Sequence, residues 1–451
     1  MEDTMHTKII AVLILILCNS IGNAQDSVYI GSLKDAVSLA LKRNVDVLNS
    51  TVDINSKRSH YVETVSDVLP QIKAGGKGID NFISPTTVVP AEYFGGAPGS
   101  VRALKMGMPY NINAVIQAKQ TIFDQAAFIS IRSSKSAVEL SHTTLEKTKE
   151  DIAVQVAYDY FNILLCSKQR DFLKKQLESQ RRLLSIAQTQ FNTGVLKKND
   201  LSRIRVNLIN TQTELQQFEN QIEQQTSDLA LLLALAPGQT VVITDSISES
   251  PLFSGGPEKF AVSDRPDWRI LDLQIQLKKL DIKYGKAGYL PALSLTGAIN
   301  QDFYGADFKR FDSDWYTSSF MAVTLDIPLF DGLKRKAQID QAHFELEKLN
   351  NRQSFLNEKS EKEIHDAQSN LAYSVSRMNS QKSNLELGSE VYGETAAEYK
   401  AGSASLSDLM NAENALLQSE RQYLSAIEEK VLAEISLRKA QGVLLKKIGV
   451  D

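Results

Sequence analysis

The sequence predicts a mainly helical chain with some β-structure, in which the two halves of the 451 residues repeat one another. Three observations support this fold class. A short motif occurs twice, two runs of about 68 residues have the periodicity of long helices, and four segments alternate apolar with polar residues as half-buried strands do. We therefore expect a protomer of long coiled-coil helical hairpins plus four transmembrane-type β-strands.

The repeated motif is an aromatic residue, a glycine three positions later and an Asp-Leu pair at positions nine and ten. The first copy is FNTGVLKKNDL (Phe191–Leu201) and the second is YKAGSASLSDL (Tyr399–Leu409). Glycine suits the left-handed backbone that ends a helix, and Asp200 and Asp408 stand where an N-cap would open the next helix. Two copies at a fixed offset favour a duplicated hairpin tip over ordinary helix punctuation.

The sequence around the tips repeats as well. Leu69-Pro70 matches Leu290-Pro291, and Phe123-Asp124 matches Phe330-Asp331. Each half is thus expected to run as helix, strand, loop, strand, long helix, tip and helix. The expected division is a first structural repeat at 25–236, an equatorial connector at 237–266, with a short strand at Thr240 to Thr244, and a second structural repeat at 267–451.

Residues 1–24 are predicted to be a signal peptide. Lys8 precedes the apolar core Ile9–Leu17, and small residues follow at the expected cleavage site. The alternative is that Cys18 is a lipoprotein cysteine, although a bulky residue precedes it. Without the leader only Cys166 remains, so no internal disulfide is expected.

The helical segments are predicted from apolar spacing and from Pro and Gly at their ends. A first helix is expected from Ser32 to Val65, because Ser32 is a candidate N-cap and Pro70 follows. The helix after the first tip keeps a three-four spacing of apolar residues, which predicts left-handed coiled-coil packing. The expected long helices are about 124–191, 200–236, 331–399 and 408–447.

Four strands are predicted from alternation, at about 70–79, 111–122, 291–300 and 319–329. Each is about 10 residues, long enough to cross a bilayer when tilted. The Pro- and Gly-rich stretch 80–110 reads as a long surface loop. Aromatic residues between the last two strands suit an interfacial girdle, and the alternative is an aromatic edge of a soluble sheet.

Four such strands cannot close a barrel, because about eight is the smallest workable number. Under the membrane interpretation more than one chain must share a barrel, and three chains would supply twelve strands. The formal net charge of −4 gives no basic footprint for nucleic acid. The five His residues are scattered without metal-ligand spacing, so we expect neither an enzyme nor a cofactor or metal site.

The paired tips, the Leu-Pro and Phe-Asp pairs and the half-chain duplication together resemble the TolC-like outer membrane efflux proteins, from roughly Ser32 to Ile448. The resemblance implies a homotrimer with a 12-stranded β-barrel in the outer membrane and an α-helical barrel in the periplasm. It implies a passive exit duct of a tripartite efflux pump for small molecules such as drugs and toxic compounds. The implied partners are a periplasmic adaptor (membrane fusion) protein and an inner-membrane transporter. Alternatives are a type I protein secretion or metal efflux duct of the same fold, or a periplasmic coiled-coil scaffold without a pore.

The resemblance also implies roles for individual residues. Asp408 would line the narrowest ring of the closed duct, and Asp200 would bond Tyr399 to hold the inner hairpin inward. The second ring position, often Asp in the family, is Asn411 here, and the position two after Gly402, Arg in the best-known member, is Ala404. These two departures predict a less cation-selective and less tightly latched gate. The alternative is that Asp200 and Asp408 only cap their helices. The expected adaptor-docking surface consists of Gly194, Val195, Gly402 and Ser403.

Overall fold

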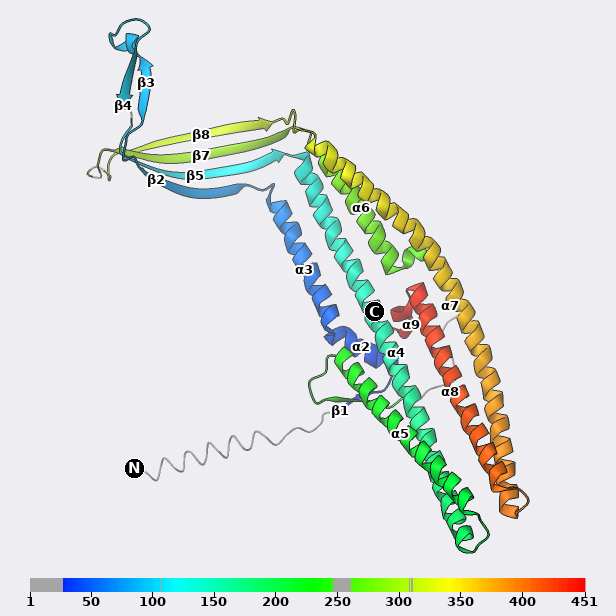
Figure 1. The fold of residues 1–451 in the computed structure, drawn as a ribbon. Coiled ribbons are helices and arrows are strands. Elements are labelled where there is room, and N and C mark those ends of the chain that lie inside the picture. The colour runs from blue at the N-terminus through cyan, green and yellow to red at the C-terminus, as the bar shows by residue number, and fades with distance from the viewer. Residues whose placement is uncertain (1–26, 106, 246–260, 308, 310, 451) are drawn as a thin grey trace, which may run out of the picture. The chain divides into compact units, whose positions relative to one another are not determined.

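The structure is a computed structural model that describes residues 27–105, 107–245, 261–307, 309 and 311–450. The expected signal peptide and Cys18 lie outside these residues. Figure 1 shows the ribbon with its elements labelled. In chain order the elements are β1 (Ser27–Ile30), α2 (Leu33–Arg43), α3 (Val45–Ser66), β2 (Gln71–Asp80), β3 (Thr86–Pro90), η1 (Ala91–Phe94), β4 (Val101–Lys105), β5 (Tyr110–Phe123), α4 (Gln125–Asn192), α5 (Lys198–Leu232), β6 (Thr240–Ile243), η2 (Val262–Asp264), α6 (Pro266–Ala287), β7 (Ala292–Gly305), β8 (Trp315–Asp326), α7 (Lys334–Ala401), α8 (Leu406–Gln441) and α9 (Leu444–Ile448).

The chain forms two compact units, and neither corresponds to one sequence repeat. The first, here called the hairpin unit, consists of Met1–Asp53, His142–Leu271 and Arg352–Asp451. The second, here called the sheet unit, consists of Ile54–Ser141 and Asp272–Asn351. Each half of the sequence contributes to both units, so the repeats are halves of a duplicated pattern and not separate domains.

The sheet unit contains one antiparallel sheet of four strands in the order β2-β5-β7-β8. The inner strands β5 and β7 are both paired along their length, whereas β2 and β8 are edge strands (Figure 1). All four expected strands are present. β7 runs five residues beyond the expected end, and β8 lies a few residues earlier than expected because Pro328 follows it and cannot continue a ladder.

The register of the sheet gathers the apolar positions on one face. Ile72 pairs with Ala118, which pairs with Gly297, which pairs with Met321. The neighbouring rows of the same face contain Ile116 beside Ile299, and Leu295 beside Val323. The opposite face carries Lys, Asn, Gln and Asp side chains, among them Asn113, whose amide donates to Asp302 at 2.7 Å. One face is therefore apolar and the other polar, as the alternation predicts.

The aromatic residues at one end of β7 and β8 form a cluster. Phe303 lies with its ring 5.2 Å from that of Phe311 and 5.8 Å from that of Trp315, measured between centroids. These residues were expected between the strands, yet Phe303 and Trp315 pair directly across β7 and β8. The strands are longer than predicted because the aromatic side chains continue the ladder and pack against one another.

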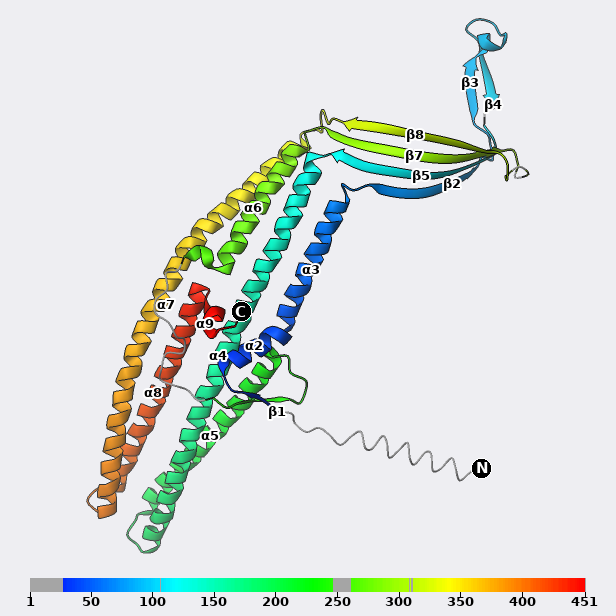
Figure 2. The ribbon, with the colours of Figure 1, turned by 180° about the vertical axis from the view of Figure 1, so that it is seen from behind.

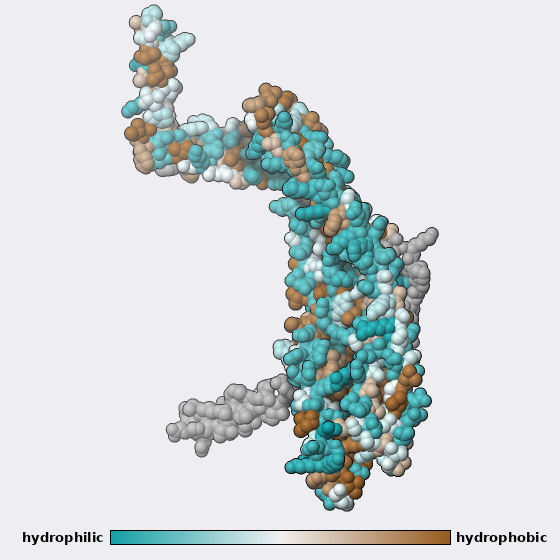
Figure 3. Space-filling model, turned by 45° about the vertical axis from the view of Figure 1, so that its right-hand side comes forward, coloured by the Kyte–Doolittle hydropathy of each residue, from teal (hydrophilic) through white to brown (hydrophobic). Residues whose placement is uncertain are grey.

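The expected loop 80–110 is wrong in part, because it contains a hairpin of its own. Strand β3 pairs with β4 in antiparallel register, and η1 connects them. The β-branched run Thr86–Val89 favours a strand, and Gly95 and Gly99 both take the left-handed backbone with φ of 78°. Figure 3 shows hydrophobic residues on this hairpin and over the sheet. Val88 of β3 and Val101 of β4 are both mostly exposed.

The first helix is divided in two, which corrects the prediction of one helix over 32–65. Asn44 leaves the helical backbone between α2 and α3, with ψ of 133°. Its amide donates to the Leu232 carbonyl at 3.0 Å, and its side-chain oxygen accepts from the Asp46 amide at 2.9 Å. This one residue ends α2, begins α3 and attaches both to the end of α5.

The long helices form two antiparallel hairpins, α4 with α5 and α7 with α8 (Figures 1 and 2). In α5 the positions with the predicted three-four spacing are buried or half-buried from Leu201 to Leu232. In α8 the residues with the same spacing, from Leu409 to Ala426, are also buried or half-buried. Within the described residues, no helix has the length and apolar character needed to cross a membrane.

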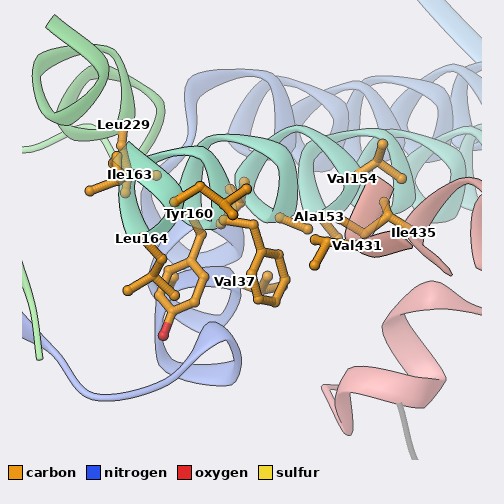
Figure 4. Packing of buried hydrophobic residues seen from close by; sticks show 14 of the residues in the cluster. Val37, Ala153, Val154, Tyr160, Ile163, Leu164, Leu229, Val431 and Ile435 are labelled. Atoms are coloured by element: carbon orange, nitrogen blue, oxygen red, sulfur yellow. The ribbon is translucent and has the colours of Figure 1, made fainter. Parts of the chain in front are cut away.

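The main core lies in the hairpin unit, where α4 and α8 pack with α2, the end of α5 and the short strands. Figure 4 shows this packing, with Tyr160 and Ile163 of α4 near Val37 and Leu229. Strand β6, predicted in the connector, pairs in parallel with β1, and the Tyr160 hydroxyl donates to Asp245 just beyond it at 2.8 Å. The connector is thereby attached to the centre of this core.

The C-terminal helix α9 is capped by a buried carboxylate of α4. The amide of Leu444 donates to Glu150 Oε1 at 2.8 Å, and that of Leu445 donates to Oε2 at 3.3 Å. Burial raises the pKa of Glu150, and the two amides partly offset this by favouring the charged form. Helix α9 is thus held against the middle of α4, which has 68 residues.

We expect Ile435→Ala to destabilise the hairpin unit by roughly 2–5 kcal/mol, since Ile435 is fully buried in the main core. Ile435→Val removes one methylene and should cost about 0.5–1.5 kcal/mol. Urea unfolding followed by circular dichroism would measure both. Equal midpoints for the two variants and the wild type would contradict the packing described here.

Candidate gate at the hairpin tips

The two tips end their incoming helices by the same set of backbone hydrogen bonds. At the first tip Gly194 N donates to the Phe191 carbonyl at 3.0 Å, and Val195 N donates to the Gln190 carbonyl at 2.9 Å. At the second tip Gly402 N donates to the Tyr399 carbonyl at 3.1 Å, and the next amide to the Glu398 carbonyl at 3.0 Å. This pair of bonds is the Schellman motif, so the duplicated sequence forms a duplicated structure.

The repeated glycines are required by backbone conformation and not by space. Gly194 has φ of 76° and Gly402 has φ of 81°, in the left-handed region that other residues reach only with strain. A Cβ built at either position would meet no atom within 4 Å. The left-handed backbone is what the helix-stop prediction requires. The surface around each glycine is open.

The aromatic residues of the motif pack into one apolar cluster, here called the tip cluster, that joins the two hairpins. Its buried members come from three helices, with Ala187 from α4, Leu201 and Ile204 from α5, and Leu406 from α8. Phe191 of the first tip and Tyr399 of the second pack against them. The tips of this protomer are in contact through these side chains.

The hydroxyl of Tyr399 donates to Gln190 Oε1 at 3.2 Å, which differs from the expected bond to Asp200. Asp200 is nonetheless close enough to act on it. Burial raises the pKa of the Tyr399 hydroxyl, and the negative charge of Asp200 adds to the increase. At the tips of this protomer, Tyr399 of the second hairpin is thus bonded to Gln190 of the first, beside the carboxylate of Asp200.

Asp408 is not an N-cap, and this corrects the sequence prediction. The N-cap is Ser405, whose hydroxyl accepts from the Asp408 amide at 3.2 Å, while the Ser405 amide donates to Asp408 Oδ2 at 3.0 Å. The pair is a capping box, and the Ser405 hydroxyl also donates to Asp408 at 2.6 Å. These bonds from Ser405 lower the pKa of Asp408, which is exposed.

The first tip lacks this capping box although it has the matching acid. Its N-cap is Lys197, whose side chain has no acceptor, so Asp200 occupies the third helical position without a serine partner. The expected N-cap role of Asp200 is therefore also wrong. The duplicated carboxylates have diverged: Asp408 caps its own helix, whereas Asp200 lies beside the other hairpin's tyrosine.

The remaining predicted residues lie on the surface of the tips. Asn411 is exposed, three residues beyond Asp408 on α8. Ala404 lies in the second tip and is half-buried. The four residues expected to dock an adaptor are all exposed: Gly194, Val195, Gly402 and Ser403.

Sequence reasoning missed two residues of this site. Ser405 has a readable signal, because Ser-x-x-Asp ahead of an apolar run is the spacing of a capping box. Gln190 has none, because its role arises only when α4 and α7 lie side by side. Across the described part of the chain, no three His, Cys, Asp or Glu side chains are grouped to hold a metal ion.

A duplicated pair of helical hairpins, together with a four-stranded sheet that has one apolar face, defines the protomer of an outer membrane channel. The chain belongs to the family of outer membrane efflux proteins, whose family model matches residues 36–235 and 261–443. It is therefore an outer membrane protein with a large periplasmic helical part.

Similar proteins align over most of the chain at low identity. The Cation efflux system protein CusC of Escherichia coli K12 is 21% identical over 425 residues, which cover 91% of this chain and 86% of CusC. Outer membrane protein TolC of the same organism is 19% identical, covering 74% of this chain and 69% of TolC. The alkaline protease secretion protein AprF of Pseudomonas aeruginosa is 22% identical, covering 73% and 69%.

Solved structures share the fold. A crystal structure of CusC has a TM-score of 0.76 with 18% identity and covers 94% of this chain and 95% of its own. The VceC structure from Vibrio cholerae has a TM-score of 0.72 with 14% identity and covers 91% and 96%. The resemblance to TolC-like proteins and the fold class it implied are thereby confirmed.

We expect Ser405→Ala to raise the pKa of Asp408 towards its ordinary value, because the serine bonds that favour the carboxylate are lost. The stability that ionised Asp408 gives to the wild-type capping box is fully present above the ordinary pKa of Asp. It is lost as the pH falls through the lowered pKa of Asp408. Carboxyl chemical shifts over an acid titration would measure the change. Ser403→Ala, at a nearby serine outside the box, should leave the Asp408 titration unchanged.

Proposed function

We propose that this chain forms the outer membrane exit duct of a tripartite efflux pump. In this proposal it passively conducts small molecules, such as drugs and toxic compounds, and performs no catalysis. The cargo arrives from a periplasmic adaptor protein and an inner-membrane transporter that supply selection and energy. One observation carries the proposal. The same chain has a sheet with one apolar face and two open edges, and helical hairpins that contact each other at their glycine-containing tips.

The open edges of the sheet support a homotrimer. Among the described residues, strands β2 and β8 each have one unpaired side, and unpaired backbone groups are costly in lipid. Pairing β8 of one copy with β2 of the next satisfies both edges, and three copies give twelve strands. The apolar face then meets lipid and the polar face lines the lumen.

The tip residues support a gate at the periplasmic end. In the proposed closed state the Tyr399–Gln190 bond and the tip cluster hold the second hairpin against the first. Asp408 of each copy contributes one negative charge near the axis, where cations would be attracted. Because Asn411 replaces a second acid, the entrance carries a single ring of charge.

The similar proteins differ in the cargo that their names indicate. The similar proteins include one named for cation efflux and one named for alkaline protease secretion. A metal efflux duct and a type I secretion duct of the same fold are thus alternatives. The inner-membrane transporter that the duct works with would determine which cargo it carries. Membership of the efflux family favours a duct over the periplasmic scaffold without a pore.

The first experiment is planar-bilayer conductance of the detergent-extracted protein, with its mass measured in parallel. A trimer with small, flickering conductance supports a closed duct. A monomer without conductance, recovered away from the membrane fraction, would overturn the proposal.

We expect Tyr399→Phe to increase the open fraction of the channel, because it removes the Tyr399–Gln190 hydrogen bond, here called the latch. Loss of a hydrogen bond of about 0.5–1.5 kcal/mol corresponds to an increase of roughly two- to tenfold for each latch. Gln190→Leu should have the same effect, because it removes the acceptor of the same bond. Asp200→Asn should act more weakly, since Asp200 affects Tyr399 through its charge. Tyr158→Phe is the matched control, because that hydroxyl contacts Ser436 in the main core. A larger effect of Asp200→Asn than of Gln190→Leu would restore the original latch assignment.

Asp408→Ala should weaken block of the channel by divalent and trivalent cations, since it removes the charged ring. Asn411→Asp should strengthen that block by adding a second ring one helical turn away. Single-channel recordings with added cations would compare both with the wild type. Unchanged block in Asp408→Ala would mean that Asp408 serves α8 as a cap and does not line the entrance.

A further inference from the structure

A buried glutamate lies between the two hairpins beyond the tip cluster. Glu413 of α8 is only 3% exposed, although it is five residues from the exposed Asp408. Its carboxylate accepts a hydrogen bond from Gln176 Nε2 and a second one from Gln180, both on α4. Those glutamines are 8% and 3% exposed. An acid and two amides therefore cross the contact between α4 and α8.

Glu413 differs from the other buried acid of its helix. Glu434, three heptads along α8, has Lys430 Nζ 3.6 Å from its carboxylate. Glu413 is buried and accepts hydrogen bonds from the two glutamine amides, and no cation among the described residues is paired with it. Neutral donors compensate a buried charge less well than a cation does, and burial raises the pKa of Glu413.

The amide of Gln180 indicates which form of the acid fits the contact. Gln180 Oε1 is buried and has no hydrogen-bond donor among the described residues. An ionised carboxylate only accepts hydrogen bonds, whereas a protonated carboxyl also donates one. A protonated Glu413 can donate to this oxygen after rotation of the side chains, so the unpaired acceptor and the buried acid satisfy each other only when the proton is present.

We propose that Glu413 is a proton-dependent link between the two hairpins, whose protonated form holds α8 against α4 and whose ionised form loosens that contact. This inference rests on the proposed gating of the duct, and it identifies a regulatory residue outside the ring and the latch.

Several charged groups lie on the helices near Glu413. Lys175 and Lys168 of α4 act on Glu420, one heptad further along α8, where burial raises the pKa to about 7 and the lysines partly offset it. Helix α5 contributes Glu214, paired with Arg421, and Glu219, paired with Lys174. Helix α7 reaches the same part of α4 through Tyr392, whose hydroxyl is 3.5 Å from that of Ser179.

The direction of the pH dependence follows from the raised pKa. Below the ordinary pKa of 4.5, Glu413 is neutral in both the closed and the loosened states, and the contact has its full strength. As pH rises through the raised pKa, the loosened state ionises more readily and the contact weakens. Each pKa difference of one between the states changes their ratio about tenfold. The contact therefore opens more readily at higher pH.

The experiment compares wild type with Glu413→Gln, which keeps the shape and removes the proton. Infrared difference spectra of the detergent-extracted trimer should show a protonated carboxyl band that Glu413→Gln lacks. Bilayer recordings from about pH 4 to pH 8 should show an open fraction that rises with pH in wild type and loses this rise in the variant. Glu219→Gln, at a surface acid of α5 that pairs with Lys174, is the control for titration of other carboxylates, and should keep both the band and the rise.

A second variant keeps the inference falsifiable if Glu413→Gln fails to fold. Gln176→Lys supplies Glu413 with the kind of cation that Lys430 supplies to Glu434, so the carboxyl band should disappear. If wild type shows no Glu413 carboxyl band at any pH, the claim that Glu413 is protonated is wrong. If the open fraction of Glu413→Gln has the wild-type pH dependence, the claim that Glu413 links the two hairpins is wrong. Absence of conductance in every form, with the band present, would count against the duct and not against the protonated acid.

Discussion

The constraint on which the structure depends is that backbone polar groups in a membrane need hydrogen-bond partners. Four strands with one apolar face fit a bilayer, yet the order β2-β5-β7-β8 leaves an unpaired side on both β2 and β8. The protomer is therefore incomplete as a membrane structure. In the proposed homotrimer each copy would present the edge that the next copy lacks, so assembly and membrane insertion would satisfy the same hydrogen bonds.

The duplication shows how one motif can serve two purposes. Both tips share the Schellman bonds and the left-handed glycine, because these depend on backbone alone. The matching carboxylates have separate roles, because the residue three positions earlier is Ser405 in one copy and Lys197 in the other. A single difference at the N-cap thus leaves Asp200 beside Tyr399 while it ties Asp408 to its own helix.

The sequence predicted the elements whose signal is local. The α5 seam and the strand alternation follow from periodicity, and the glycine tips follow from backbone preference. The division of the first helix at Asn44 was missed, because its cause is a hydrogen bond to Leu232 about 190 positions away. The β3–β4 hairpin was missed because Pro and Gly around it outweighed the β-branched run. Gln190 was missed because its partner lies on another helix.

The two hairpins are joined by a larger buried apolar cluster at the main core than at the tips, and the proposed gate requires this difference. The main core joins α4 and α8 through many fully buried side chains, such as Tyr160, Val431 and Ile435. The tip cluster has four buried residues, and beyond it the contact passes through the polar group of Gln176, Gln180 and Glu413. Elements with little buried apolar surface separate at lower cost than those with much. In the proposed gate, the tips would therefore part while the main core stays packed, and the polar group of Gln176, Gln180 and Glu413 would set how readily they do so.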